Sequence, residues 1–207
     1  DEDGDTVQNI TNWYRNNISI TALYMPFEGG SGASTTEDYS GHGNTGTVNE
    51  AIWNISGGKV GGGYSFDGYD DHIDLGDNYD LAGTNFTVCA WAYPTDINNG
   101  YLLGKFDVST NKGFWLRMEN NVNWSSGTES GKGMVGVEDV TLDTWQYLCA
   151  VINPSPGRSA LYKNGVEIAS STEVASTVDN SRSMMIGNRY DNGRPYEGRI
   201  DEVKIFT

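Results

Sequence analysis

Apolar and polar residues alternate with a period close to two along most of the chain, and no stretch of 12 residues presents a helical apolar face. This pattern predicts short β-strands separated by Gly, Asn and Pro turns. The expected strands cover residues 18–27, 46–49, 62–68, 71–76, 86–94, 101–107, 113–119, 133–139, 145–153, 158–165, 166–172, 183–189 and 198–206. About a dozen such strands predict an all-β fold, a two-sheet antiparallel sandwich.

One turn is specific enough to fix a strand pair. Asn164-Gly165 lies between two β patterns in "LYKNGVEIA". This dipeptide favours a type I′ hairpin, because both central residues of that turn need a positive φ. We therefore expect 158–164 and 166–172 to be antiparallel neighbours.

Residues 1–17, "DEDGDTVQNITNWYRNN", do not follow the pattern of the rest. A few apolar residues, Val7, Ile10, Trp13 and Tyr14, lie among acids and amides. The segment is either a linker or tail of a preceding domain, or a strand that adds to the sheet of a neighbouring subunit. We divide the chain into this extended N-terminal segment and one domain over 18–207.

The chain has 207 residues, a formal net charge of −15 and a pI of about 4.3. Such a charge repels phosphate backbones and anionic membrane surfaces, which argues against nucleic-acid and membrane binding. No apolar run reaches the roughly 18 residues of a membrane span, and the N-terminus lacks the features of a signal peptide, so we expect a mature or excised chain. A Gly-rich, acidic exterior is common on secreted proteins.

Cys89 and Cys149 both lie in predicted strands, "FTVCAWAYP" and "TWQYLCAVIN". They form a disulfide if those strands are neighbours, and otherwise they are two buried thiols. Candidate N-glycosylation sites follow the N-x-S/T motif at Asn9, Asn17, Asn54, Asn85 and Asn123.

Several stretches resemble successive blocks of one family. These are "ALYMPFEGG", "DYSGHGNTGTV", "YSFDGYDDHIDLG", "FTVCAWAYP", "TWQYLCAVI", "ALYKNGVEIA" and "MMIGNRYDNGRPYEGRIDEVKIF". In order and spacing they resemble a laminin-G-like, concanavalin A-like jelly roll of the type repeated in bacterial and archaeal surface proteins. The resemblance covers about residues 20–207, and the opening segment resembles the last strand of an immunoglobulin-like repeat.

The resemblance implies one structural Ca²⁺ between the loop after the first strand and the start of the last strand. The matching residues are Asp38, Asn44 and Asp201, with Glu28 close in sequence to the same loop. Ca²⁺ takes six to eight oxygen ligands, which a Gly-rich loop with Asp and Asn can supply. The alternative is that Asp38 and Asn44 form Asx turns. The aspartates of "GYSFDGYDDHIDLGDN" (63–78) are expected to form a turn rather than one site.

The sequence contains none of the catalytic motifs that we compared with it. Glucan hydrolases of this fold carry Glu-x-Asp-x-(x)-Glu on one strand, and retaining hydrolysis needs two carboxyl groups about 5 Å apart. The sequence contains no such string, and it contains no H-E-x-x-H, G-x-S-x-G or P-loop motif. We therefore expect no enzymatic activity.

Sugar binding is the ligand function that the sequence favours. Lectins pack aromatic rings against sugars and bind their hydroxyls with Asn, Asp and Arg. The segment 187–196 is richest in such residues, and Tyr69, Tyr101 and Trp124 are expected in other loops. Its candidate ligand-binding residues are Asn188, Arg189, Tyr190, Asp191, Arg194 and Tyr196. The alternative is that these aromatic residues pack on the sandwich and the polar ones form turns.

The sequence thus predicts a non-enzymatic extracellular module of a cell-surface protein or filament, structural or adhesive in role and stabilised by calcium. A carbohydrate-binding module using loop 187–196 is the alternative, and a diverged glycoside hydrolase is the least favoured hypothesis. Expected partners are other copies of the chain or other surface domains, joined by strand addition through residues 1–17, or glycans.

Overall fold

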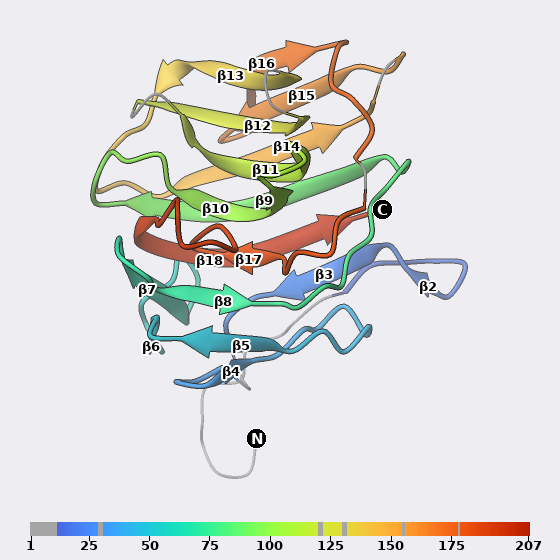
Figure 1. The fold of residues 1–207 in the computed structure, drawn as a ribbon. Coiled ribbons are helices and arrows are strands. Elements are labelled where there is room, and N and C mark those ends of the chain that lie inside the picture. The colour runs from blue at the N-terminus through green and yellow to red at the C-terminus, as the bar shows by residue number, and fades with distance from the viewer. Residues whose placement is uncertain (1–11, 29–30, 120–121, 130–131, 155, 178) are drawn as a thin grey trace.

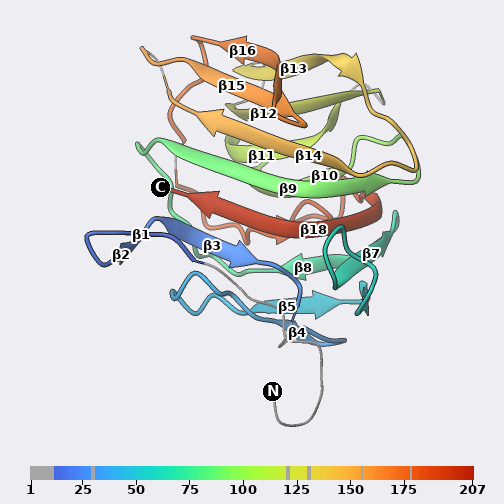
Figure 2. The ribbon, with the colours of Figure 1, turned by 180° about the vertical axis from the view of Figure 1, so that it is seen from behind.

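The computed structural model describes residues 12–28, 31–119, 122–129, 132–154, 156–177 and 179–207, and these form two packed β-sheets (Figure 1). The front sheet has the order β13 (Lys132–Asp139), β12 (Asn123–Glu129), β11 (Lys112–Glu119), β10 (Tyr101–Asp107), β17 (Met185–Ile186), β8 (His72–Asp74), β5 (Gly46–Asn49) and β4 (Thr35–Thr36). The back sheet has the order β16 (Val166–Ser171), β15 (Ser159–Lys163), β14 (Gln146–Ile152), β9 (Phe86–Pro94), β18 (Glu197–Phe206), β7 (Gly63–Asp67) and β6 (Ile52–Asn54), and β3 (Thr21–Met25) also pairs with β18 (Figure 2). The predicted all-β antiparallel sandwich is confirmed.

Alternate residues of each strand enter the core between the sheets, as a period of two requires. In β11 of the front sheet, Phe114, Leu116 and Met118 join the core. Trp115 and Arg117, between them in sequence, therefore lie on the outer face of the front sheet, away from the core.

Strand β18 changes its neighbour half-way along. One edge pairs with β9, while the other pairs with β7 through Glu197–Ile200 and with β3 through Val203–Phe206. The register against β9 shifts between Asp201 and Lys204, and Glu202 has a φ of 54°. This β-bulge places Asp201 at the point where the neighbouring strand changes.

The main strand that the alternation missed is β12. Its residues Ser125, Ser126 and Thr128 are polar but buried. Two of their hydroxyls donate to backbone carbonyls: Ser126 Oγ to that of Trp115 at 2.8 Å, and Thr128 Oγ1 to that of Ala175 at 2.5 Å. A buried strand with satisfied polar side chains has no apolar alternation to detect. The strand predicted over 18–27 is also interrupted, by residue 20 between β2 (Ile18–Ser19) and β3.

The described part of the N-terminal segment folds back on its own chain. Strand β1 (Tyr14–Arg15) pairs with β2 through a turn in which Asn16 and Asn17 have φ values of 52° and 64°. The hairpin projects from one side of the sandwich (Figure 2). Residues 1–11, with the candidate glycosylation site Asn9, lie outside the described residues, so strand addition to a neighbour stays a prediction.

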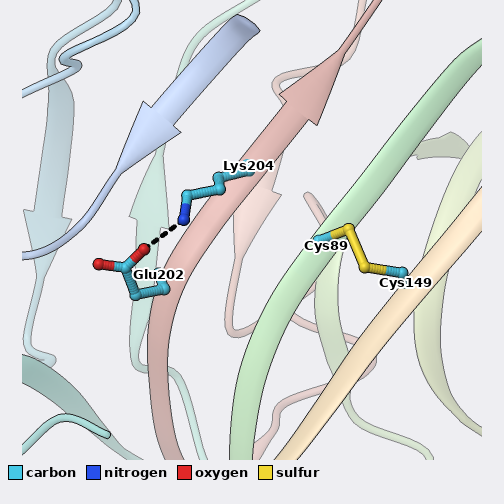
Figure 3. Close-up of a disulfide and its surroundings, with 4 residues drawn as sticks. All are labelled: Cys89, Cys149, Glu202 and Lys204. Carbon is cyan, nitrogen blue, oxygen red and sulfur yellow. Dashed lines mark hydrogen bonds and ion pairs between the residues drawn. A yellow bond between two sulfur atoms is a disulfide. The ribbon is translucent and has the colours of Figure 1, made fainter. Parts of the chain in front are cut away.

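The structure contains a disulfide between Cys89 of β9 and Cys149 of β14, which are register partners (Figure 3). The Glu202–Lys204 ion pair lies on the neighbouring strand β18 in the same view. Of the candidate glycosylation sites, Asn17, Asn54 and Asn85 are exposed, and Asn123 is half-buried. The described residues contain no helix with the length and apolar character that crossing a bilayer requires.

Reducing the disulfide should lower the free energy of unfolding by about 2–4 kcal/mol, because the bond closes a long loop in the unfolded chain. The two cysteines are 60 residues apart in sequence. Chemical denaturation with and without reductant measures the difference. The double variant Cys89→Ala/Cys149→Ala should unfold at the same denaturant concentration as the reduced protein and should not respond to reductant. Coincident unfolding curves for oxidised and reduced protein would contradict the expectation.

Candidate functional site

A cavity of about 470 Å³ opens on the outer face of the front sheet, over β10 to β13. Residues from these four strands and from the segment before β18 line it. They are Phe106, Val108, Asn111, Trp115, Arg117, Glu119, Ser125, Gly133, Val135, Arg189 and Arg194. The cavity thus combines apolar, aromatic and charged groups in one concave place, the usual make-up of a ligand site.

Aromatic side chains form the floor of the cavity. Tyr101, Phe106 and Trp115 make a small buried cluster separate from the main core, with the Phe106 and Trp115 rings 4.9 Å apart in an edge-to-face arrangement. The indole of Trp115 lies across two strands at positions where both carry glycine. A Cβ at Gly127 would come within 2.7 Å of Trp115 Cζ2, and one at Gly133 within 3.3 Å. The two glycines therefore leave the room in which the indole lies.

Arg117 lies over this floor. Its guanidinium group is 5.1 Å from the Trp115 ring centroid and 5.4 Å from that of Tyr101, both within cation–π range. It also pairs with Glu119, and one of its terminal nitrogens is 3.4 Å from the Tyr101 hydroxyl. Burial raises the pKa of Tyr101, so its phenol stays neutral. Arg117 Nε is buried and has no hydrogen-bond acceptor among the described residues.

Two more arginines reach the cavity from the segment before β18. Arg189 binds Asp191 through two nitrogens, at 2.7 and 3.0 Å, and this pairing lowers the pKa of Asp191 although burial opposes it. Arg194 makes no ion pair with any carboxylate in the described part of the chain. This edge of the cavity therefore has two guanidinium groups. That of Arg189 is fixed by Asp191, and that of Arg194 has no carboxylate partner among the described residues.

The structure divides the six ligand residues predicted in segment 187–196. Arg189 and Arg194 line the cavity, and Asp191 holds Arg189. Tyr190 lies under Arg182, whose guanidinium carbon is 4.5 Å from the ring centroid. Asn188 and Tyr196 have no exposed surface, so their prediction as ligand-binding residues is wrong.

Each of the two buried residues has a structural partner instead. Asn188 Oδ1 accepts from the backbone N–H groups of Arg189 and Arg194, at 2.8 and 3.3 Å, and so shapes the segment. Tyr196 belongs to the core and packs against Phe66. Trp124, expected in an exposed loop, is also buried, and its indole N–H donates to Gln146 at 3.1 Å.

Sequence reasoning missed the cavity residues on the strands, above all Trp115, Arg117 and Val135. The pattern of "GFWLRME" does predict a strand, but both of its faces carry large side chains, so alternation does not tell the core face from the outer face. The one available signal is Arg117 between apolar neighbours, which marks the face that does not enter the core.

The four predicted metal ligands form two separate groups. Glu28 and Asp201 both bind the loop at 57–62: Gly62 N–H donates to the Glu28 carboxylate at 3.1 Å, and the N–H groups of Lys59 and Val60 donate to Asp201 Oδ2 at 2.8 and 3.0 Å. Asp201 is fully buried. Burial, together with the charge of Glu202, raises the pKa of Asp201 to about 7, and burial also raises that of Glu28.

Glycines make this close approach of loop and carboxylates feasible. A Cβ at Gly58 would lie 2.0 Å from the carbonyl oxygen of Gly62 and 2.7 Å from Asp201 Oδ2. Two buried acids and loop carbonyl groups are the oxygen donors that Ca²⁺ takes in proteins. The structure thus brings Glu28 and Asp201 to the same loop, where both carboxylates accept backbone N–H groups.

Asp38 and Asn44 belong to a different arrangement. Asp38 Oδ1 accepts from the backbone of Tyr24 and Ser40, at 3.0 and 2.9 Å. Its Oδ2 accepts from Ser40 Oγ at 2.7 Å and from the backbone and side-chain nitrogens of Asn44 at 3.2 and 3.3 Å. These five donors account for the burial of the carboxylate, in the manner of the Asx-turn alternative.

The aspartates of 63–78 do not converge on one point. Asp77 pairs with Lys105 at 2.6 Å, whereas Asp71 accepts from the backbone of Asp67 at 2.8 Å. Carboxylate oxygens of Glu50, Asp70 and Asp71 do lie within 4.8 Å of one another, at the turn between β7 and β8. Exposed acids gather in this way without a ligand, and Glu50 is exposed.

The outer face of the back sheet carries a second aromatic surface. Trp91 and Tyr147 pack with ring centroids 5.1 Å apart, and Tyr93 and Trp145 at 5.5 Å. Arg199 lies 4.0 Å over the Tyr93 ring. These half-buried rings pack against one another between β9 and the segment formed by Trp145 and β14, which stabilises the sheet.

Comparison with known proteins agrees with this architecture. Residues 66–207 match the laminin-G-like family described as the concanavalin A-like lectin/glucanases superfamily. The chain belongs to this family. Among curated proteins, this laminin-G-like chain is 27% identical to the pentraxin-related protein PTX3 of Homo sapiens over 128 residues, 59% of the chain. It spans only 33% of the length of that relative.

Solved structures similar to this laminin-G-like domain share its fold. Domain 4 of AbnA, an extracellular arabinanase of Geobacillus stearothermophilus in complex with arabinotriose, has a TM-score of 0.71 at 20% identity, with 90% of this chain and 91% of that chain covered. The CBM40 of a Ruminococcus gnavus sialidase bound to α2,3-sialyllactose has a TM-score of 0.56 at 15% identity, with 70% and 89% covered. The binding domain of botulinum neurotoxin serotype G has 0.64 at 16%, with 90% and 47% covered.

The glycine under the Trp115 indole should be required for the shape of the cavity. We expect Gly127→Ala to lower the free energy of unfolding by about 1–3 kcal/mol, because the new Cβ would lie 2.7 Å from both the Trp115 ring and Gly133 Cα and so overpack the site. Tryptophan fluorescence measures the change around the Trp115 ring, and urea unfolding measures the change in stability. Gly32→Ala is the matched control, since a Cβ there meets no atom within 4 Å. Equal stability of the two variants would show that the ring is not confined by Gly127.

Proposed function

We propose that this laminin-G-like domain is a glycan-binding module and that its ligand occupies the cavity over β10 to β13. The observation that carries the proposal is the convergence of polar groups from β11 and from the segment before β18 on one cavity of about 470 Å³ with an aromatic floor. A cavity of this volume accommodates a small oligosaccharide or the terminal residue of a longer one.

The fold neighbours support this choice. Domain 4 of the arabinanase is in complex with arabinotriose, and the sialidase CBM40 is bound to α2,3-sialyllactose. Both likenesses are below 25% identity, so they concern the fold, and the ligand of this chain is argued from its own residues. Loop 187–196, predicted from the sequence to present the ligand site, contributes Arg189 and Arg194.

The lining of the cavity favours binding over hydrolysis. Glu119 is the single carboxylate among its described lining residues, and that group pairs with Arg117. Glycoside hydrolysis ordinarily needs two carboxyl groups flanking the scissile bond. A structural or adhesive role in a surface protein or filament, the other function expected from the sequence, stays a prediction and is compatible with glycan binding.

An extracellular location follows from the same proposal. The Cys89–Cys149 disulfide is of the kind that persists in oxidising compartments, and the described candidate glycosylation sites all keep some accessible surface. Glycans on neighbouring cells or in the surrounding matrix are the partners that such a module would contact.

We also propose a structural calcium ion held by Glu28 and Asp201. Bound there, the ion would neutralise two buried carboxylates and join the loop at 57–62 to β18. The raised pKa of Asp201, about 7, reflects burial of charge that a cation would stabilise.

Glycan binding should be lost when the wall of the cavity is altered without touching its core contacts. Val135 lines the cavity and is 44% exposed. We expect Val135→Glu to abolish binding on a glycan array, because the longer, charged side chain enters the cavity and pairs with its arginines. Val166→Glu is the matched control, since Val166 is 59% exposed on β16 of the other sheet. A blank array for the unaltered protein, or equal binding by both variants, would refute the proposed site.

Calcium should stabilise the protein more at pH 8 than at pH 5. Without the ion, Asp201 keeps its proton in the folded state up to about pH 7, whereas in the unfolded chain it loses the proton from about pH 4. The free energy of unfolding therefore falls as the pH rises from about 4 towards about 7. Calcium binds the deprotonated carboxylate and reverses this loss. At a calcium concentration 100 times its Kd the gain is about 2.7 kcal/mol, or about 5–10 °C in Tm.

Glu28→Gln should remove the calcium-dependent gain in Tm. Asp38→Asn should lower Tm equally with calcium and with chelator, because Asp38 lies in a separate hydrogen-bond network. Identical melting of the unaltered protein in calcium and in chelator at pH 8 would refute the ion.

A further inference from the structure

The cavity lining is basic, whereas the chain as a whole is acidic. The chain has 13 Lys and Arg against 28 Asp and Glu, yet the described residues that line the cavity include three arginines and one acid. Two of the three arginines have carboxylate partners, Glu119 for Arg117 and Asp191 for Arg189. The third, Arg194, has none among the described residues, so the cavity keeps an excess of positive charge.

Two of the three arginines, Arg117 and Arg189, are held in place before any ligand arrives. Arg117 lies against the Trp115 and Tyr101 rings, and its side chain is 15% exposed. Arg189 is fixed by its two bonds to Asp191 and is also 15% exposed. Preorganised guanidinium groups lose little side-chain entropy when they bind an anion.

An unsatisfied donor lies within the same group. Arg117 Nε is buried and has no acceptor among the described residues, although the rest of its guanidinium pairs with Glu119. A buried N–H without a partner costs free energy, which an oxygen atom from a ligand would recover. Any oxygen acceptor would satisfy this donor, so the preference for an anionic ligand rests on the excess charge of the described lining residues.

The aromatic floor is not arranged for stacking against a neutral sugar. Trp115 is 5% exposed and Phe106 is 7% exposed, and the Arg117 guanidinium lies over the Trp115 ring. A sugar entering the cavity meets guanidinium groups before it meets an open ring face. Val108 and Val135, which are more exposed, supply the apolar wall for its carbon atoms.

We infer that the cavity takes a sugar that bears a carboxylate, which Arg194 binds together with Arg117. The inference rests on the proposed glycan-binding function and names the class of glycan. Sialic acids and uronic acids share this chemistry. The planar guanidinium fork matches a planar carboxylate with two parallel hydrogen bonds. The net charge of −15 opposes polyanions, so a single acidic group within the cavity is the expected ligand.

The carboxylate is tested with two pairs of probes that differ only in that group. These are the α-methyl glycoside of N-acetylneuraminic acid and methyl β-D-glucuronide, each compared with its own methyl ester by titration calorimetry. We expect at least one acid to bind about tenfold or more tightly than its ester, because hydrogen bonds to arginine are stronger when the acceptor is charged. Which acid shows the difference identifies the source of the carboxylate.

Arg194→Gln should remove this preference, so that the acid and its ester bind the variant with about equal affinity. Arg158→Gln is the matched control, since Arg158 is exposed beside the back sheet, where it pairs with Glu167, and the preference should persist in it. Equal affinity for acid and ester in the unaltered protein overturns the inference.

The test separates failure of the inference from failure of the proposed function. If acid and ester bind alike and Val135→Glu abolishes both, the cavity binds glycans but does not recognise the carboxylate. If neither acid nor ester binds and the glycan array is blank, the proposed function fails as well.

Discussion

The pairing of β18 is the constraint on which most of this structure depends. Its ten residues bond β9 along one edge and, along the other, first β7 and then β3. The change of partner requires the bulge at Asp201, and the bulge turns a buried carboxylate towards the loop at 57–62. The loop at 57–62 is therefore joined to β18 through one acidic residue, Asp201, and the protonation of that residue affects the stability of the junction.

The front sheet is governed by a different constraint, because it buries side chains on both faces. Phe114 and Leu116 enter the core, while Trp115 packs with Phe106 and Tyr101 on the outer face. Aromatic residues on the outer face of a sheet are stable where neighbouring strands leave room for them. Glycine at two positions of β12 and β13 provides that room, and it also produces the concave surface above the rings.

The fold could be predicted from the sequence more fully than the site could. Strands β5 and β9 have the bounds expected from alternation, because one face enters the core. Strand β12 lacks that signal, because hydroxyl groups such as that of Ser126 find acceptors within a buried strand. Contacts between distant segments have no local signal at all. Asp38 takes four of its five donors from Ser40 and Asn44, within six residues, whereas Asp201 accepts from Lys59, more than 140 residues away. The sequence alone therefore could not show that the predicted metal ligands lie in two separate groups.

The contrast between an acidic exterior and an arginine-lined cavity has a consequence for selectivity. Screening in physiological salt limits the field of exposed charges to about 8 Å, so a small ligand inside the cavity responds chiefly to the arginines beside it. A long polyanion extends beyond the cavity and meets the surrounding acids, which repel it. Repulsion of the wrong ligand contributes to specificity as much as attraction of the right one. The acidic surface therefore strengthens discrimination in favour of a short glycan with one charged group.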